Sequence, residues 1–257
     1  MAILSVKNLS VSIKKDSRII VDKVSFNIEK GEILILSGAN GCGKTTIIRS
    51  ILGEIENEKI YSGTILFDDQ LDILTCKETQ LRDFRKRIGY VPQEDVYNSI
   101  GRRINVATIL NDSAESYYKR HTLSKEEMHV LLHKFAPGRE NKPQFDISQK
   151  PQKLSGGQQR LLSIISAIAV RKNAAFFIID EPLNNLDYDN MRNISNLINS
   201  IHKENDKAAF LIVTHCRIFP FVTRRLEIIS GKIVSESYIQ EKCYDCIGKP
   251  NNKGFYE

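Results

Sequence analysis

The sequence lacks long apolar runs, and this shortage argues against a membrane-spanning helix. No stretch approaches the roughly 18 consecutive apolar residues that a transmembrane helix needs. The first residues reach Lys7 without the long apolar core of a secretory signal. We therefore expect the chain to stay in the cytoplasm, where any membrane association would be peripheral and on the cytoplasmic face.

The sequence has too few cysteines for a disulfide-rich scaffold, with five in 257 residues. An odd number in a chain without a secretory signal argues against a disulfide framework. Cys243 and Cys246 form a lone CxxC, whereas a structural zinc site normally has four ligands. Two unpaired thiols are the favoured interpretation of this pair, and a metal or redox role is the alternative.

The composition is that of an ordinary globular protein with a moderate positive charge. Hydrophobic residues make up 41% and charged residues 26% of the chain, and the net charge is +6. Such an excess permits contact with anionic lipid or nucleic acid but requires neither. The basic cluster from Arg82 to Arg87 fits a solvated helix face as well as a docking patch, and no nucleic-acid partner is expected.

A glycine-rich segment at residues 38–45 fits the pattern G-x-x-x-x-G-K-[ST]. It follows an apolar run at residues 33–36 and precedes a predicted helix at residues 45–52, which is the context that a phosphate-binding P-loop needs. Backbone N–H groups and the helix N-terminus would bind phosphate oxygens. Lys44 would reach the β- and γ-phosphates, and Thr45 would ligate Mg²⁺. A plain glycine-rich turn is the alternative. The predicted nucleotide-binding residues are Gly38, Ala39, Asn40, Gly41, Cys42, Gly43, Lys44, Thr45 and Thr46.

Polar residues follow two further apolar runs, at residues 175–179 and 209–213. Continuous apolar runs are typical of parallel strands that are covered on both faces, and ligands bind beyond the carboxyl ends of such strands. Asp180 would hold Mg²⁺, directly or through water. Glu181 would position or polarise the water that attacks the γ-phosphate. A pair of solvated acids is the alternative.

The motif that discriminates among P-loop proteins is Leu-Ser-Gly-Gly-Gln at residues 154–158, directly before a predicted helix at residues 157–169. A serine hydroxyl, glycine N–H groups and a helix N-terminus form a second anion site. In this order the motifs resemble the nucleotide-binding domain of ATP-binding cassette (ABC) proteins, over essentially the whole chain to about Ser237. The resemblance implies ATP and Mg²⁺ as cofactors.

The resemblance also assigns roles to individual residues. It implies catalytic roles for Glu181, His215 and Gln93, and metal contacts for Thr45, Gln93 and Asp180. It implies a head-to-tail dimer in which the second anion site closes on the nucleotide of the other subunit, whether a second copy or a paralogue. The residues of this second half-site are Ser155, Gly156, Gly157, Gln158 and Asp187.

The expected fold is α/β, with a P-loop NTPase core built on a parallel sheet. An antiparallel β subdomain is expected at the N-terminus, with strands at residues 3–13, 24–28 and 62–69, and an α-helical subdomain is expected as an insertion. We interpret residues 1–257 as one nucleotide-binding domain. Its helical subdomain with the signature helix covers about 97–172, and its C-terminal tail covers 238–257.

Some positions depart from the family pattern. Ile13 occupies the place of the usual aromatic residue that stacks on adenine, which leaves base selectivity open. Leu161 and Ser166 stand where arginines are common, and Cys216 follows His215 where an acid is usual. None of these changes removes a phosphate, metal or water contact, so we still expect ATP hydrolysis.

The leading functional hypothesis is the ATPase subunit of a transporter whose membrane spans lie on a separate permease. That partner would dock in a groove near Gln93 and the helical subdomain. A soluble ABC ATPase of a cytosolic assembly, such as iron–sulfur cluster biogenesis, is the alternative. DNA-repair members of the superfamily insert a long coiled coil, for which the segment before residue 154 is too short and too broken by proline.

Overall fold

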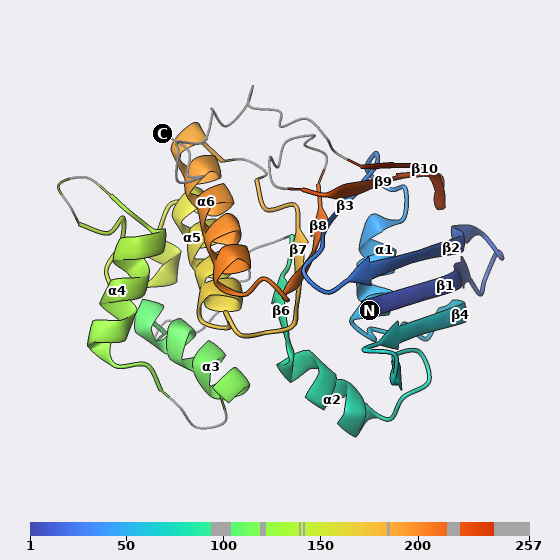
Figure 1. The fold of residues 1–257 in the computed structure, drawn as a ribbon, viewed down its shortest axis with the longest axis horizontal. Helices are drawn as coiled ribbons and strands as arrows, with labels where there is room; N and C mark the ends of the chain where they lie inside the picture. Colours follow the sequence, from blue (N-terminus) through green and yellow to red (C-terminus); the bar gives the residue numbers. More distant parts are fainter. Residues whose placement is uncertain are drawn as a thin grey trace.

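The computed structural model describes residues 1–93, 104–118, 122–138, 140, 142–183, 186–214 and 222–238. Two sheets and a group of helices form the molecule (Figure 1). None of the helices in this described part is long and apolar enough to cross a membrane.

The first sheet is antiparallel, with strand order β2-β1-β4-β5. Its strands are β1 (Ala2–Ile13), β2 (Ile19–Glu29), β4 (Lys59–Phe67) and β5 (Leu71–Asp72). Side chains such as Leu4, Val6, Ile65 and Phe67 point into the core, whereas the intervening residues are more exposed. This alternation is what a sheet with one solvated face requires.

The second sheet has six strands in the order β10-β9-β3-β8-β7-β6. The strands β3 (Ile33–Ser37), β6 (Ile88–Val91), β7 (Phe176–Asp180), β8 (Ala209–Val213) and β9 (Arg224–Ile229) are mutually parallel. The last strand, β10 (Lys232–Tyr238), forms an antiparallel hairpin with β9. The apolar run Phe176–Ile179 of β7 and the fully apolar β8 are consistent with burial on both faces.

Two hydrophobic cores lie on opposite faces of the six-stranded sheet. Alternate residues of one strand feed both cores, so that Phe177 joins the helical side and Phe176 joins the side of the first sheet. Helix α1 (Lys44–Ile51) packs between the sheets. The helices on the other face are α3 (Val106–Tyr118), α4 (Lys125–Phe135), α5 (Gly156–Ile164) and α6 (Tyr188–Glu204) (Figure 1).

The expected fold class is confirmed, and several boundaries shift by a few residues. The predicted strand at residues 209–213 coincides with β8. The predicted helix at 157–169 is instead α5 followed by a π-helical turn, Ile165–Ala169. The basic cluster from Arg82 to Arg87 lies largely on a helix, α2 (Glu78–Lys86), as one of its two interpretations expected. Sequence reasoning missed the helix α6 and the strands β6, β9 and β10. The helices α3, α4 and α5 lie between β6 and β7 in the chain, where a helical insertion was predicted.

Candidate active site

The P-loop connects the end of β3 to the start of α1. Three of its glycines have positive φ angles, 150° at Gly38, 78° at Gly41 and 110° at Gly43. A Cβ atom at Gly43 would lie 2.9 Å from the carbonyl oxygen of Ile20, and one at Gly38 would lie 2.3 Å from that of Ile228. The loop therefore needs glycine at these two positions both for its dihedral angles and for its close backbone contacts.

Lys44 is the first residue of α1, and its side chain folds back over the loop. Its ammonium group donates hydrogen bonds to the carbonyl oxygens of Gly38 at 2.8 Å and Ala39 at 3.0 Å. The residue is only 7% exposed. The loop thus holds a single cation above the helix N-terminus, where an anion is favoured.

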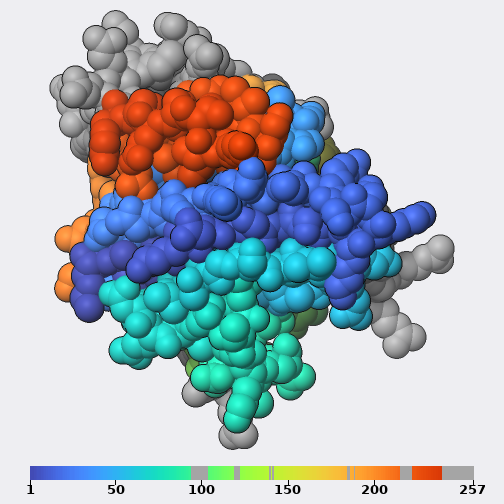
Figure 2. Space-filling model, turned by 90° about the vertical axis from the view of Figure 1, so that its right-hand side faces the viewer, coloured from blue at the N-terminus to red at the C-terminus, as the bar shows by residue number. Residues whose placement is uncertain are grey.

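The hairpin of β9 and β10 contacts the P-loop through a backbone hydrogen bond. The N–H of Gly231, in the turn between β9 and β10, donates to the carbonyl of Cys42 at 2.9 Å. The carbonyl of Gly231 accepts from the N–H of Asp22 at 2.8 Å, and Lys232 forms an ion pair with Asp22 at 3.2 Å. Figure 2 shows this hairpin lying along the N-terminal sheet. The phosphate-binding loop is therefore held by both β2 and the hairpin.

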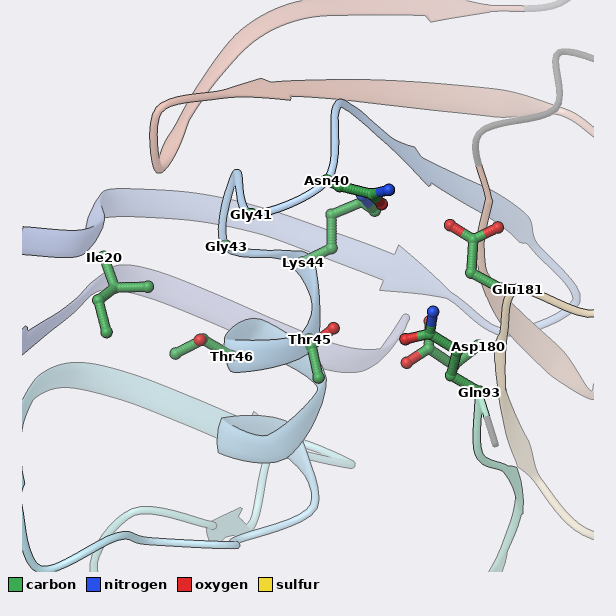
Figure 3. Close-up of a pocket in the computed structure, with 10 residues that line it drawn as sticks. All are labelled: Ile20, Asn40, Gly41, Gly43, Lys44, Thr45, Thr46, Gln93, Asp180 and Glu181. Atoms are coloured by element: carbon green, nitrogen blue, oxygen red, sulfur yellow. The ribbon is translucent and has the colours of Figure 1, made fainter. Parts of the chain in front are cut away.

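A cavity of about 210 Å³ brings the P-loop together with the two other predicted motifs (Figure 3). Thr45, Gln93 and Asp180 all line it, with Thr45 on the side of the P-loop helix and the other two on the facing side, although they come from α1, from the segment after β6 and from the end of β7. Glu181 lies across from Asn40 and Lys44. The lining residues are Ile20, Asn40, Gly41, Gly43, Lys44, Thr45, Thr46, Gln93, Asp180 and Glu181.

The two acids at the end of β7 are almost completely buried, at 2% exposure for Asp180 and 3% for Glu181. The backbone N–H of Glu181 donates to the carbonyl of Val213 at 2.7 Å, which ties this residue to the neighbouring strand. Its φ angle is 48°, a left-handed conformation that costs energy in a residue with a side chain. Burial, followed by the charge of Glu181, raises the pKa of Asp180 from 3.8 to about 6.

These residues fit a magnesium ion. A hydroxyl, an amide and a carboxylate offer the oxygen ligands that Mg²⁺ prefers, and Mg²⁺ is usually held by one or two carboxylates together with substrate phosphates. The raised pKa of Asp180 marks a buried carboxylate whose negative charge a cation would stabilise. Among the described residues no group of three or more His, Cys, Asp and Glu forms a separate metal site.

The predicted second half-site lies apart from this cavity. Ser155 caps α5 by accepting a hydrogen bond from the N–H of Gln158 at 3.3 Å, and the Gln158 side chain accepts one from the N–H of Ser155 at 3.0 Å. Ser155 and Gly156 are exposed. Neither lines the P-loop cavity, and Gln158 and Asp187 line a different cavity of about 510 Å³. One chain therefore presents two separate candidate phosphate sites.

Four residues named in the sequence analysis lie outside the part of the chain that the structure describes, and one residue that lines the cavity was not predicted. His215, Cys216, Cys243 and Cys246 lie outside the described residues. Ile13 does not line the cavity, whereas Ile20 of β2 does, on the opposite side of the P-loop from Asp180 (Figure 3). The signal for Ile20 was weak because it is one of two adjacent isoleucines at the start of a strand.

Comparison with known proteins gives a consistent match. The sequence model of the family described as "ABC transporter" matches residues 21–184. The oligopeptide transport ATP-binding protein OppF of Bacillus subtilis is 30% identical over 218 residues, which cover 83% of this chain and 68% of that protein. The methionine import ATP-binding protein MetN 2 of Bacillus cereus is 29% identical over 234 residues, which cover 91% and 63%. The chain thus spans about two thirds of the length of these relatives.

Solved structures share the fold. The dimeric ATP-binding cassette MJ0796 in a post-hydrolysis state bound to ADP and Pi superimposes with a TM-score of 0.72 at 24% identity. The alignment covers 92% of this chain and 99% of that one. A structure titled as the ATP binding subunit of an ABC transporter gives a TM-score of 0.73 at 22% identity, covering 92% and 90%.

Proposed function

The chain belongs to the ABC transporter family of ATPases, and on this premise we propose that it powers a transporter whose membrane spans lie on a separate chain. The observation that carries the proposal is the separation of its two candidate phosphate sites. The P-loop cavity holds the residues for ATP and Mg²⁺, whereas Ser155 and Gly156 are exposed elsewhere on the molecule. A head-to-tail dimer would bring each half-site to the other.

The residues of the cavity divide the chemistry among them. The N–H groups of the P-loop and the Lys44 ammonium would bind the phosphates of ATP, and Thr45 and Asp180 would hold Mg²⁺. Magnesium, when bound, would neutralise charge on the phosphate oxygens. Glu181 orients the attacking water and accepts its proton, and Gln93 helps to position this water. The strained backbone of Glu181 keeps its carboxylate facing the P-loop lysine.

The dimer is tested at Gly156, where the fold leaves room for a side chain. No atom lies within 4 Å of a Cβ built at Gly156, whereas one at Gly157 would lie 2.8 Å from the Asn190 amide. Gly156→Asp should therefore fold normally while its charge repels the nucleotide of the other subunit. In a Glu181→Gln background, which slows hydrolysis, ATP should convert the protein from monomer to dimer in size-exclusion chromatography with light scattering.

Adding Gly156→Asp to that background should abolish the ATP-dependent dimer but leave ATP binding to the P-loop intact. Asn57→Asp, an exposed change that also adds one negative charge, is the matched surface control and should leave the dimer unaffected. An ATP-dependent dimer that survives Gly156→Asp would contradict the head-to-tail arrangement.

A groove between the core and the helical region is the proposed contact for the permease. This cavity, of about 300 Å³, contains both charged and apolar residues, and burial raises the pKa of its Tyr90 to about 12, so the phenol stays neutral. A short amphipathic helix of the partner would fit such a surface. The lining residues are Leu52, Glu54, Arg85, Ile88, Tyr90, Ser113, Ser166, Ala167 and Arg171.

Membrane association separates this proposal from a soluble ABC ATPase. We expect the chain to co-fractionate with membranes only when its permease is present, and candidates can be taken from permeases that serve peptide and methionine transport, because the relatives carry those names. Replacing Arg85 with Glu should weaken this association without changing ATP binding. A chain that never joins any membrane fraction would support the soluble alternative.

A further inference from the structure

One arginine links three motifs of the site without lining the P-loop cavity. Arg160 belongs to α5 and lies about one and a half turns beyond the capping residue Ser155. Only 4% of the residue is exposed. A buried arginine is costly unless its N–H groups are paired, so its partners indicate what it does.

The guanidinium group donates to the backbone on both sides of the catalytic cavity. Its Nη1 atom donates to the carbonyl of Pro92, directly before Gln93. Its Nη2 atom donates to the carbonyl of Asp180 and, at 3.0 Å, to the carbonyl of Glu181. One side chain thus connects the signature helix to the segment of Gln93 and to the end of β7.

We propose that Arg160 is a positioning residue, which transmits the orientation of the signature helix to the catalytic Glu181 and to Gln93. The inference rests on the proposed function, because it requires that the half-site at the start of α5 closes on the nucleotide of a second subunit. Only such closure would change the orientation of α5. Docking of the other subunit's nucleotide at Ser155 would shift the N-terminal turn of α5. The guanidinium would then move the carbonyls that fix the two residues beside the attacking water.

The chemistry of arginine suits this role better than that of any other cation. Its planar fork offers donors along two edges, so it can bond to Pro92 on one side and to the β7 end on the other. A lysine has a single nitrogen and cannot span both sides with the same geometry. The positive charge also lies close enough to lower the pKa of Asp180, which partly offsets the effect of burial on that carboxylate.

The strained backbone of Glu181 makes its orientation sensitive to the hydrogen bond from Arg160. Its left-handed φ angle of 48° must be held by its surroundings, and it is fixed from one side by the bond to Val213 and from the other by Arg160. Removing one of these two bonds should let the carboxylate leave its catalytic orientation while the P-loop stays in place.

The test separates binding from turnover. Arg160→Gln and Arg160→Lys are made in the full chain, and ATP affinity is measured with a fluorescent ATP analogue in parallel with steady-state hydrolysis. We expect Arg160→Gln to bind the analogue within about threefold of wild type and to lose about 10- to 100-fold in kcat, as other supporting contacts do. Arg160→Lys should recover part of this loss, because it keeps the charge and one set of donors.

Arg224 provides the matched control for a merely structural effect. It is also a buried arginine, at 6% exposure, and it pairs with Glu32 at 3.0 Å and with the carbonyl of Asn27, away from the cavity. Arg224→Gln should lower thermal stability but leave kcat per folded molecule unchanged. Thermal melts of all variants set the temperature at which each is fully folded.

The outcomes distinguish this inference from the proposed function. Wild-type protein without ATPase activity would contradict the function itself. Active wild type with an equally active, folded Arg160→Gln would overturn the inference alone. An Arg160→Gln variant that loses ATP affinity in parallel with kcat would also overturn it, because the residue would then support binding rather than catalytic geometry.

Discussion

The Lys44 ammonium lies 2.8 Å from the carbonyl oxygen of Gly38, so the backbone of the P-loop itself holds the lysine that is expected to bind phosphate. A second bond, to Ala39 at 3.0 Å, fixes the same group from a neighbouring position. The side chain is therefore ordered before a phosphate arrives. This pre-organisation lowers the entropy that binding would otherwise cost.

Replacing Lys44 with Ala should lower ATP affinity by about 10- to 100-fold, because a charge-assisted hydrogen bond to phosphate is lost. The measurement is a titration with a fluorescent ATP analogue. Lys86→Ala, on the exposed face of α2, serves as the control and should bind the nucleotide as wild type does. Equal affinity in the Lys44 variant would mean that this cavity is not where the phosphates bind.

The raised pKa of Asp180 predicts a pH-dependent stability in the absence of nucleotide and Mg²⁺. Its folded pKa of about 6 lies above its ordinary 3.8, so the fold favours the protonated form. This contribution to stability is fully present below about pH 4 and is lost as the pH rises through 6. Asp180→Asn should therefore raise the free energy of unfolding at pH 8, on the order of 1–3 kcal/mol, and have little effect at pH 4.

Urea titrations at pH 4, 6 and 8 in the presence of a chelator measure this effect. Asp83→Asn on the exposed surface of α2, where the carboxylate is 76% exposed, is the control and should show no such rise with pH. A gain for Asp180→Asn that is equal at all three pH values would contradict the role of this ionisation. With ATP and Mg²⁺ present the sign should reverse, because the variant loses a metal ligand.

The aliphatic residue at position 13 predicts weak discrimination between nucleotide bases. Ile13 cannot stack a ring on the base, and Ile20 offers only an apolar contact on that side of the cavity. We expect ATP and GTP to bind within about tenfold of each other. Ile20→Tyr, at the isoleucine that does line the cavity, should raise ATP affinity by about 2- to 10-fold, the usual worth of an aromatic stacking contact. Competition titrations with both nucleotides check this, and Ile20→Leu is the aliphatic control.

The structure of the hairpin turn predicts that a substitution at Gly231 weakens nucleotide binding at the P-loop, which is far from it in the sequence. Its φ angle is 79°, and a Cβ there would lie 2.4 Å from the carbonyl oxygen of Ile20. Gly231→Ala should displace the turn from Cys42, lower stability by about 2 kcal/mol and weaken ATP binding. Thermal melts and nucleotide titrations measure the two effects. Val234→Ala, an exposed change on β10, should produce neither.

Local patterns in the sequence predicted the motif-bearing core because each motif lies within a few residues of a strong structural signal. The P-loop follows one apolar run and Asp180 ends another, so the positions of the strand ends were enough to predict that they lie together. The helix α6 was missed although Ile194, Leu197 and Ile201 have helical spacing, because asparagines and serines between them weaken the pattern.

Contacts between distant segments could not be predicted in the same way. In the sequence Arg160 is one charged residue on a helix next to glutamines, and nothing local indicates that it turns inward to the carbonyls of Pro92 and Glu181. The positive φ of Glu181 and the hydrogen bond between Gly231 and Cys42 likewise depend on tertiary packing. Local propensity is a weak guide wherever tertiary contacts set the conformation.

The pairing of β3 with β9 has a consequence for synthesis of the protein. The Ser37 hydroxyl, one residue before the P-loop, donates to the carbonyl of Leu226 at 3.1 Å across a separation of 189 positions. At about 5–20 residues per second a ribosome needs roughly 10–40 s to add that length. The phosphate-binding loop therefore emerges well before its flanking strand, so nucleotide cannot bind the completed site until Leu226 has also been made.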